Sequence, residues 1–152
     1  MLLESETQEL EAAWVFFYQS ARYLETCSPS DQLVGNAPIF VPRDSAPARH
    51  VSYLRPLAES HAAYLYCGDP NASPRAQVRL TGRQRGALAV SAIRTIREHS
   101  SLGLAAAKQA IDACLGVKGK AVIDTTSVAA AVSLMGALSK LGFVSEVTYG
   151  DG

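Results

Sequence analysis

The stretch LAVSAIRTIREHSSLGLAAAKQAIDACL, residues 88–115, decides the fold of the second half of the chain. Its apolar residues recur at three- and four-residue steps on both sides of Ser100–Gly103. This spacing predicts two amphipathic helices, from Leu88 to about His99 and from Leu104 to Leu115. Gly103 stands where one helix reverses into the next, and glycine permits the left-handed backbone angles of such a turn. The segment therefore predicts a helical hairpin.

The flanking residues predict short strands and a third helix. Strands are expected at 77–80, 121–123 and 143–149, where β-branched and apolar residues cluster or alternate. Thr126 or Ser127 can cap a helix that runs to about Leu141 and ends at Gly142. Its inward side is expected to carry Val128, Val132, Met135 and Leu138. The order strand–helix–helix–strand–helix–strand predicts a two-layer α+β domain over residues 76–152, with helices on one face of the sheet.

The pattern of residues 1–75 predicts a mostly helical region, which is separate from the α+β domain. Ser5 to about Cys27 has apolar residues at helical spacing, with Ser5 as N-cap. A proline-rich loop over 28–49 holds a short strand at Ile39–Val41, and a second helix is expected at Pro56–Cys67. The linker composition of Asp69–Pro74 places the domain boundary between residues 75 and 76.

The aromatic residues of the first expected helix must be covered. They are Trp14, Phe16, Phe17 and Tyr18. An apolar surface of this size predicts burial, either within residues 1–75 or in a homodimer through residues 5–26. The glutamates at its start, Glu4, Glu6, Glu9 and Glu11, are expected to stay solvated.

The composition is that of a globular protein, with 48% hydrophobic and 18% charged residues. Its net charge of zero hides an asymmetry. Residues 1–75 carry 5 Lys+Arg and 9 Asp+Glu, a net −4, and residues 76–152 carry 9 and 5, a net +4. No apolar run has the length of a membrane span, and the N-terminus lacks a secretion signal, which predicts a cytoplasmic protein without membrane contact. The three cysteines form no C-x-x-C pair and are expected to be buried, reduced thiols.

Residues 76–152 resemble the C-terminal domain of the bacterial ribosomal stalk protein. LGLAAAK at 102–108, followed by Ile111 and Asp112, is similar to the family's L-G-L-K-E-A-K segment. AIRTIR at 92–97 is similar to its V-I-K-A-V-R, and LSKLG at 138–142 to the close of its last helix, L-x-x-A-G. The resemblance covers about half of the chain. The family's N-terminal dimerisation helices and hinge are absent from residues 1–75.

The resemblance implies a domain that recruits a protein partner through its first two helices. The residues that match this surface are Ile93, Arg94, Arg97 and Lys108. By resemblance the partner is a translational GTPase, the ribosome or a host regulatory protein. Because the dimerisation helices are missing, the resemblance fits a phage-encoded or accessory protein better than a ribosomal subunit.

Two other functions stay open. Arg83 and Arg85 in the Gly82–Gly86 turn, with Lys118 and Lys120, are able to contact RNA or DNA phosphates, and the G-x-x-G of residues 116–119 resembles the KH-domain loop. Alternatively, the protein is structural and assembles through its N-terminal helix.

No catalytic motif is visible in the sequence. It contains no G-x-S-x-G, Walker A loop, G-x-G-x-x-G or H-E-x-x-H, and His50, His61 and His99 are scattered. We therefore expect neither catalytic residues nor a metal or other cofactor. The function that the sequence predicts is a non-catalytic protein–protein interaction module, with nucleic-acid binding and assembly as alternatives.

Overall fold

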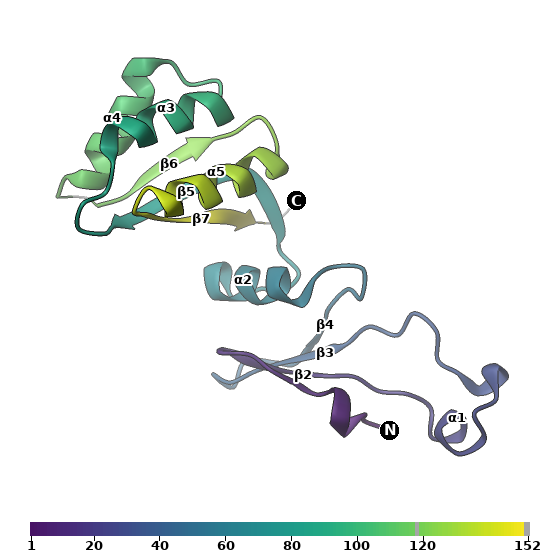
Figure 1. Ribbon diagram of the computed structural model, residues 1–152. Coiled ribbons are helices and arrows are strands. Elements are labelled where there is room, and N and C mark those ends of the chain that lie inside the picture. Colours follow the sequence, from purple (N-terminus) through teal and green to yellow (C-terminus); the bar gives the residue numbers. More distant parts are fainter. Residues whose placement is uncertain (118, 151–152) are drawn as a thin grey trace. The chain divides into compact units, whose positions relative to one another are not determined.

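The computed structural model describes residues 1–117 and 119–150, and it divides into two compact units (Figure 1). Unit 1 is Met1–Ala72 and unit 2 begins at Ser73. Both units combine helices with an antiparallel sheet, which confirms the α+β class. Among the described residues, no helix is long and apolar enough to cross a membrane.

Unit 2 has the strand and helix order that the sequence predicts. Its elements are β5 (Ser73–Arg83), α3 (Ala89–His99), α4 (Leu104–Leu115), β6 (Ala121–Asp124), α5 (Val128–Lys140) and β7 (Phe143–Gly150). The sheet order is β6-β5-β7, so the first strand is central and both others pair with it antiparallel. The β-α-α-β-α-β prediction is confirmed.

The core of unit 2 lies between the sheet and its three helices. Val78 and Leu80 of β5 and Ile123 of β6 are fully buried on the face that the helices cover. The helices contribute Ala92, Ile96, Ala107, Ile111, Ala131, Leu134 and Leu138. Full burial of one such aliphatic side chain is worth about 1.5–3 kcal/mol, so this cluster holds the unit together.

Helix registers in unit 2 differ from expectation at several positions. Leu88 and Leu104 were expected inside, but they stand at the two helix starts and are 56% and 60% exposed. On α5 the buried positions are Ala131, Leu134 and Leu138, whereas Val132 is 51% exposed. The apolar composition of α5 allows either side to face inward, and packing against the sheet buries the side that carries Ala131, Leu134 and Leu138.

Helix ends show which capping predictions hold. Ser127 caps α5, because its Oγ accepts a hydrogen bond from the Ala130 N–H at 3.0 Å. Gly142 follows α5 with φ +85°, the left-handed conformation expected there. Gly103 does not have this conformation: it is the N-cap of α4, with φ −73° and ψ 172°. The predicted left-handed turn at Gly103 is therefore wrong.

Unit 1 is built on a sheet, and the prediction of a mostly helical region is wrong. Its strands are β1 (Gln8–Glu9), β2 (Ala13–Phe16), β3 (Ile39–Pro42) and β4 (Arg49–His50), paired in that order. The short helical segment η1 (Glu4–Glu6) precedes β1, α1 (Ala21–Thr26) and η2 (Pro29–Asp31) lie between β2 and β3, and α2 spans Leu57–Cys67 after β4. The short strand expected at Ile39–Val41 and the helix ending before Gly68 are confirmed.

The expected helix from Ser5 to Cys27 fails for a physical reason. Trp, Val and Phe are enriched in strands, and AWVF at 13–16 pairs with β3 as a strand. Both sides of this strand are apolar, so alternation was masked and the run fitted a helical period equally well. Only Ala21–Thr26 of this stretch form an α-helix, so the expected helical interface is absent, and a homodimer through residues 5–26 stays a prediction.

A small core joins α2 to one face of the unit 1 sheet. Ala13, Val15 and Phe40 point from β2 and β3 to this inner face and are completely buried. Tyr64 of α2 packs there, with its ring centre 5.2 Å from that of Phe40. The side chains of the opposite face do not take part in this core.

Candidate protein-binding surfaces

The outer face of the unit 1 sheet, directed away from α2, carries aromatic and aliphatic side chains. Trp14 and Phe16 alternate with the buried Ala13 and Val15, so they lie on the side opposite α2. The register sets Trp14 against Val41 and Phe16 against Ile39. All four are half-buried and absent from the core cluster. We call Trp14, Phe16, Ile39 and Val41 the outer face.

Two further rings extend the outer face. His50 on β4 lies opposite Ile39, and Tyr18 continues the alternation beyond Phe16. The two rings meet edge to face, with their centres 6.3 Å apart. The aromatic surface therefore crosses three neighbouring strands.

Arg43 packs over Trp14 at one end of the outer face. Its guanidinium carbon lies 4.5 Å from the centre of the Trp14 ring, a cation–π contact. The same side chain donates hydrogen bonds to the Leu10 carbonyl at 3.2 Å and to the Glu9 carboxylate. Trp14 is thus held in one orientation by a charged side chain that is itself anchored.

An acidic edge borders the outer face. β1 is the edge strand of the sheet, and four exposed glutamates lie on it or beside it: Glu4, Glu6, Glu9 and Glu11. Their expected solvation is confirmed. Residues 1–72 carry 4 Lys+Arg and 9 Asp+Glu, a net −5, and residues 73–152 carry 10 and 5, a net +5. A partner protein that contacts this acidic edge is therefore expected to do so with a basic surface.

Two hydrogen bonds tie the strands and the β3–β4 hairpin to α2. The Tyr64 hydroxyl donates to the Asp44 carboxylate, and His61 Nε2 accepts the Ala12 N–H at 3.2 Å. The first bond holds the pKa of Asp44 below its usual value and, with burial of the ring, raises the pKa of Tyr64. These contacts position β2 and β3, which carry the outer face.

The residues that resemblance assigned to partner binding lie in unit 2. Arg94 and Arg97 are exposed on one side of α3, and Lys108 is exposed on α4, which packs against α3. Ile93 is half-buried against the core. Three cations are thus exposed on this helical hairpin, and their role in binding stays a prediction.

The basic turns also gather in unit 2. Arg83 ends β5, Arg85 follows in the next turn, and Lys120 precedes β6, so the three exposed cations lie at one end of the sheet. Lys118 lies outside the described residues. The KH-like interpretation of residues 116–119 is wrong, because the strand β6 follows the loop where a KH domain has a helix.

In the described part of the chain, no three His, Cys, Asp or Glu side chains gather to hold a metal ion. Cys114 is buried as expected, and burial raises the pKa of its thiol. Cys27 and Cys67 are exposed free thiols, so their expected burial is wrong.

The sequence prediction missed the outer face. Trp14 and Phe16 were assigned to a helix, and Ile39–Val41 to a separate short strand that was not paired with them. The usable signal was the concentration of aromatic and β-branched residues in AWVFFY at 13–18, together with the apolar strand IFV at 39–41, which supplies its partner.

Aromatic residues at the centre and charged residues at the rim are the composition that protein–protein interfaces favour. The sequence model of one family, immunity protein 35, matches residues 1–77, which is half of the chain and includes all of unit 1. The chain belongs to this family. No curated protein and no solved structure matches it.

The family match corrects the identification suggested by residues 76–152. The chain is an immunity-family protein and not a ribosomal stalk-domain protein, and the translational partners implied by that resemblance lose their basis. The strand and helix order of unit 2 stands independently, since the structure shows it directly. Binding to a protein partner remains the general function, and the family match over unit 1 now supports it.

Proposed function

We propose that the protein binds a protein toxin through unit 1 and neutralises it without catalysis. The observation that carries the proposal is the outer face: Trp14, Phe16, Ile39 and Val41 form paired apolar positions inside the segment that matches the immunity family. Aromatic residues at the centre of an interface contribute most of its binding energy. All four side chains are partly exposed in the free chain, so a partner is able to contact them.

The Trp14–Arg43 contact supports a preorganised surface. Ordering a long side chain on binding costs about 0.5–1.5 kcal/mol, and Trp14 is already oriented by the guanidinium above it. Arg43 is anchored in turn by Glu9 and the Leu10 carbonyl. These side chains therefore lose little conformational entropy when a toxin covers them.

The acidic edge sets the expected charge of the toxin. Glu4, Glu6 and Glu11 are exposed beside the outer face, and unit 1 is negative overall. A basic toxin surface gains in association rate from such complementarity, and the gain decreases with salt. We place the complex in the cytoplasm, because the exposed free thiols Cys27 and Cys67 fit a reducing compartment.

The test pairs the chain with the proteins encoded by the genes that flank its own. Each is expressed in bacteria with and without the chain, growth is recorded, and the affinity of any protective pair is measured. Trp14→Ala is expected to weaken binding by about 2 kcal/mol, roughly 30-fold, since it removes the largest side chain of the outer face. Glu4→Lys with Glu6→Lys is expected to slow association.

The matched control lies in unit 2. Arg94→Glu with Arg97→Glu changes two exposed side chains of α3 and leaves the outer face intact. This double variant is expected to bind like the wild type. If the double variant loses toxin binding while Trp14→Ala retains it, the toxin binds the exposed surface of α3, and the proposed binding site on unit 1 is wrong. Circular dichroism of each variant checks that the fold is kept.

A further inference from the structure

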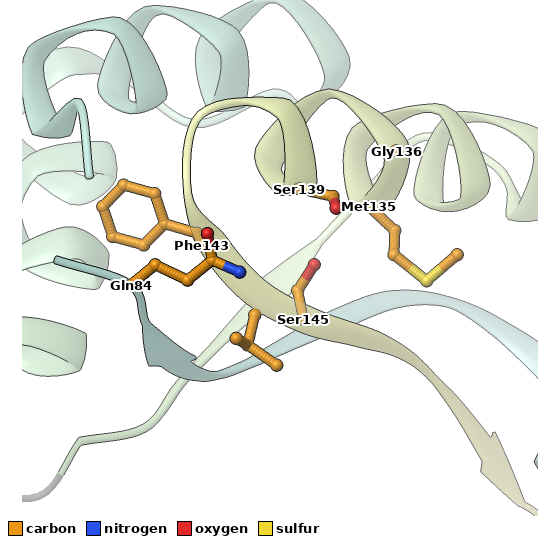
Figure 2. Close-up of a pocket in the computed structure, with 7 residues that line it drawn as sticks. Gln84, Met135, Gly136, Ser139, Phe143 and Ser145 are labelled. Atoms are coloured by element: carbon orange, nitrogen blue, oxygen red, sulfur yellow. The ribbon is translucent and has the colours of Figure 1, made fainter. Parts of the chain in front are cut away.

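A groove runs along one flank of α5 in unit 2. Its larger part is a hollow of about 350 Å³ between Met135, Gly136 and Ser139 of α5 and Phe143 and Ser145 of β7 (Figure 2). Gln84 and Ser139 also line a second hollow of about 270 Å³, which reaches Arg85 and Lys140. The two hollows are neighbours, because Gln84 and Ser139 line both. We call them together the groove, with an apolar end in the first hollow and a cationic end in the second.

The strand beside the groove has a free edge. In the sheet order β6-β5-β7, β7 pairs with β5 on one side, and no described strand pairs with the other. Along Phe143–Gly150, every second residue therefore directs its N–H and C=O away from β5. Such an edge is a template for an added strand. The hollow between α5 and β7 borders this strand, since Phe143 and Ser145 line it.

Gly136 keeps the groove open at a cost to the helix. It lies in the interior of α5, where glycine is a poor helix former. A Cβ atom at this position would meet nothing within 4 Å, so neither close packing nor backbone conformation requires glycine here. The missing side chain deepens the wall of the groove.

The groove also contains an unsatisfied polar group. In Figure 2 the Ser145 side chain points from β7 toward α5. Its hydroxyl is covered and has no hydrogen-bond partner among the described residues. Displacement of the flexible Met135 or Gln84 side chain by an incoming segment would give this hydroxyl a partner.

The cationic end favours an acidic occupant. Arg85 and Lys140 are both exposed there. The nearby carbonyls of Gly142 and Leu141 already accept hydrogen bonds from the N–H groups of Gln84 and Leu88, at 2.7 and 2.9 Å. The side-chain cations are therefore the groups left to attract a ligand, and a carboxylate complements them.

We propose that this groove is the docking site of an extended acidic segment of a partner protein. The segment adds a strand to the free edge of β7, places an apolar side chain in the hollow between Met135 and Phe143, and directs a carboxylate to Arg85 and Lys140. The site lies wholly within unit 2 and does not depend on toxin binding by unit 1.

The test uses a displayed library of random nine-residue peptides selected on the intact chain. Enriched peptides are expected to combine β-branched residues, one large apolar residue and a carboxylate. Their affinity is then measured for Gly136→Leu, which fills the groove. The matched control is Ser133→Leu, which adds the same side chain at an exposed position of α5 outside both hollows.

Gly136→Leu is expected to weaken peptide binding at least tenfold, whereas Ser133→Leu leaves it unchanged. Arg85→Glu with Lys140→Glu is expected to remove the preference for acidic peptides. The proposal is overturned if no peptide is enriched, or if enriched peptides bind Gly136→Leu as tightly as the wild type. Binding that Trp14→Ala abolishes and Gly136→Leu spares would place the peptides on unit 1 and also overturn it.

Discussion

The Tyr64 hydroxyl lies 2.7 Å from both carboxylate oxygens of Asp44, and through this contact α2 holds the hairpin between β3 and β4. The two residues are 20 positions apart in the sequence, so neither local propensity nor hydrophobic spacing indicates their pairing. The contact joins an exposed carboxylate to a ring that belongs to the core of unit 1.

Stability is expected to depend on pH through this contact. The pKa of Asp44 is lowered from 3.8, chiefly by the hydrogen bond from Tyr64. A lowered carboxyl pKa adds stability above its unfolded value, and that stability is lost as the pH falls through the folded value. Tyr64→Phe should therefore lower the melting temperature at pH 7, with the difference shrinking below pH 3.8. A difference that is constant from pH 7 to pH 2.5 would contradict this.

Two glycines of unit 2 are expected to respond to alanine with opposite signs. Gly136→Ala should stabilise the protein by about 0.5–1 kcal/mol, because alanine is the better helix residue and meets no neighbour. Gly142→Ala should destabilise it by roughly 1–3 kcal/mol, because φ is +85° and the new Cβ would lie 3.1 Å from Ala87 Cα. Urea unfolding of the two variants measures both. If both variants changed the free energy of unfolding in the same direction, the structural environment of one of the two glycines would be wrongly described.

A side chain at Gly103 should be tolerated. As the N-cap of α4 in extended conformation, this residue offers no side-chain oxygen to the first helical turn. Gly103→Ser supplies one and is expected to raise stability by a few tenths of a kcal/mol. Thermal unfolding compares it with the wild type. A loss of more than about 1 kcal/mol would indicate that the turn needs a positive φ after all.

Thiol labelling should separate the cysteines. Cys27 and Cys67 are exposed, whereas Cys114 is buried and burial raises the pKa of its thiol. The thiolate is the reactive form, so a maleimide at pH 7 is expected to add two labels to the native chain and a third only after unfolding. Mass spectrometry counts the labels. Rapid addition of three labels to the folded protein would place Cys114 at the surface.

Trp14, the one tryptophan of the sequence, reports on the outer face. Because it is half-buried beneath Arg43, its emission should lie between those of a solvated and a core tryptophan. Arg43→Ala is expected to shift the emission toward the solvated wavelength and to increase quenching by acrylamide. An unchanged spectrum and quenching constant would mean that Arg43 does not cover the ring.

The sequence predicts unit 2 well because its decisive contacts are local. The helix repeats around Ile96 and Ile111 and the cap at Ser127 are each readable within about 15 residues. Unit 1 is different, because its short strands are stabilised by partners far along the chain, as Trp14 is by Val41. Strand propensity depends on such packing, so the outer face could be recognised only once β2 and β3 were paired.

The central position of β5 has a consequence for synthesis. β5 is the first element of unit 2 to leave the ribosome, yet it obtains β7 only after all three helices have been made, and Arg79 then pairs with Glu146 across 67 positions. A nascent chain that stops before Phe143 would leave one edge of β5 without a partner strand. Truncated products should therefore be recognised by chaperones and proteases, which bind unpaired strands and exposed apolar surface.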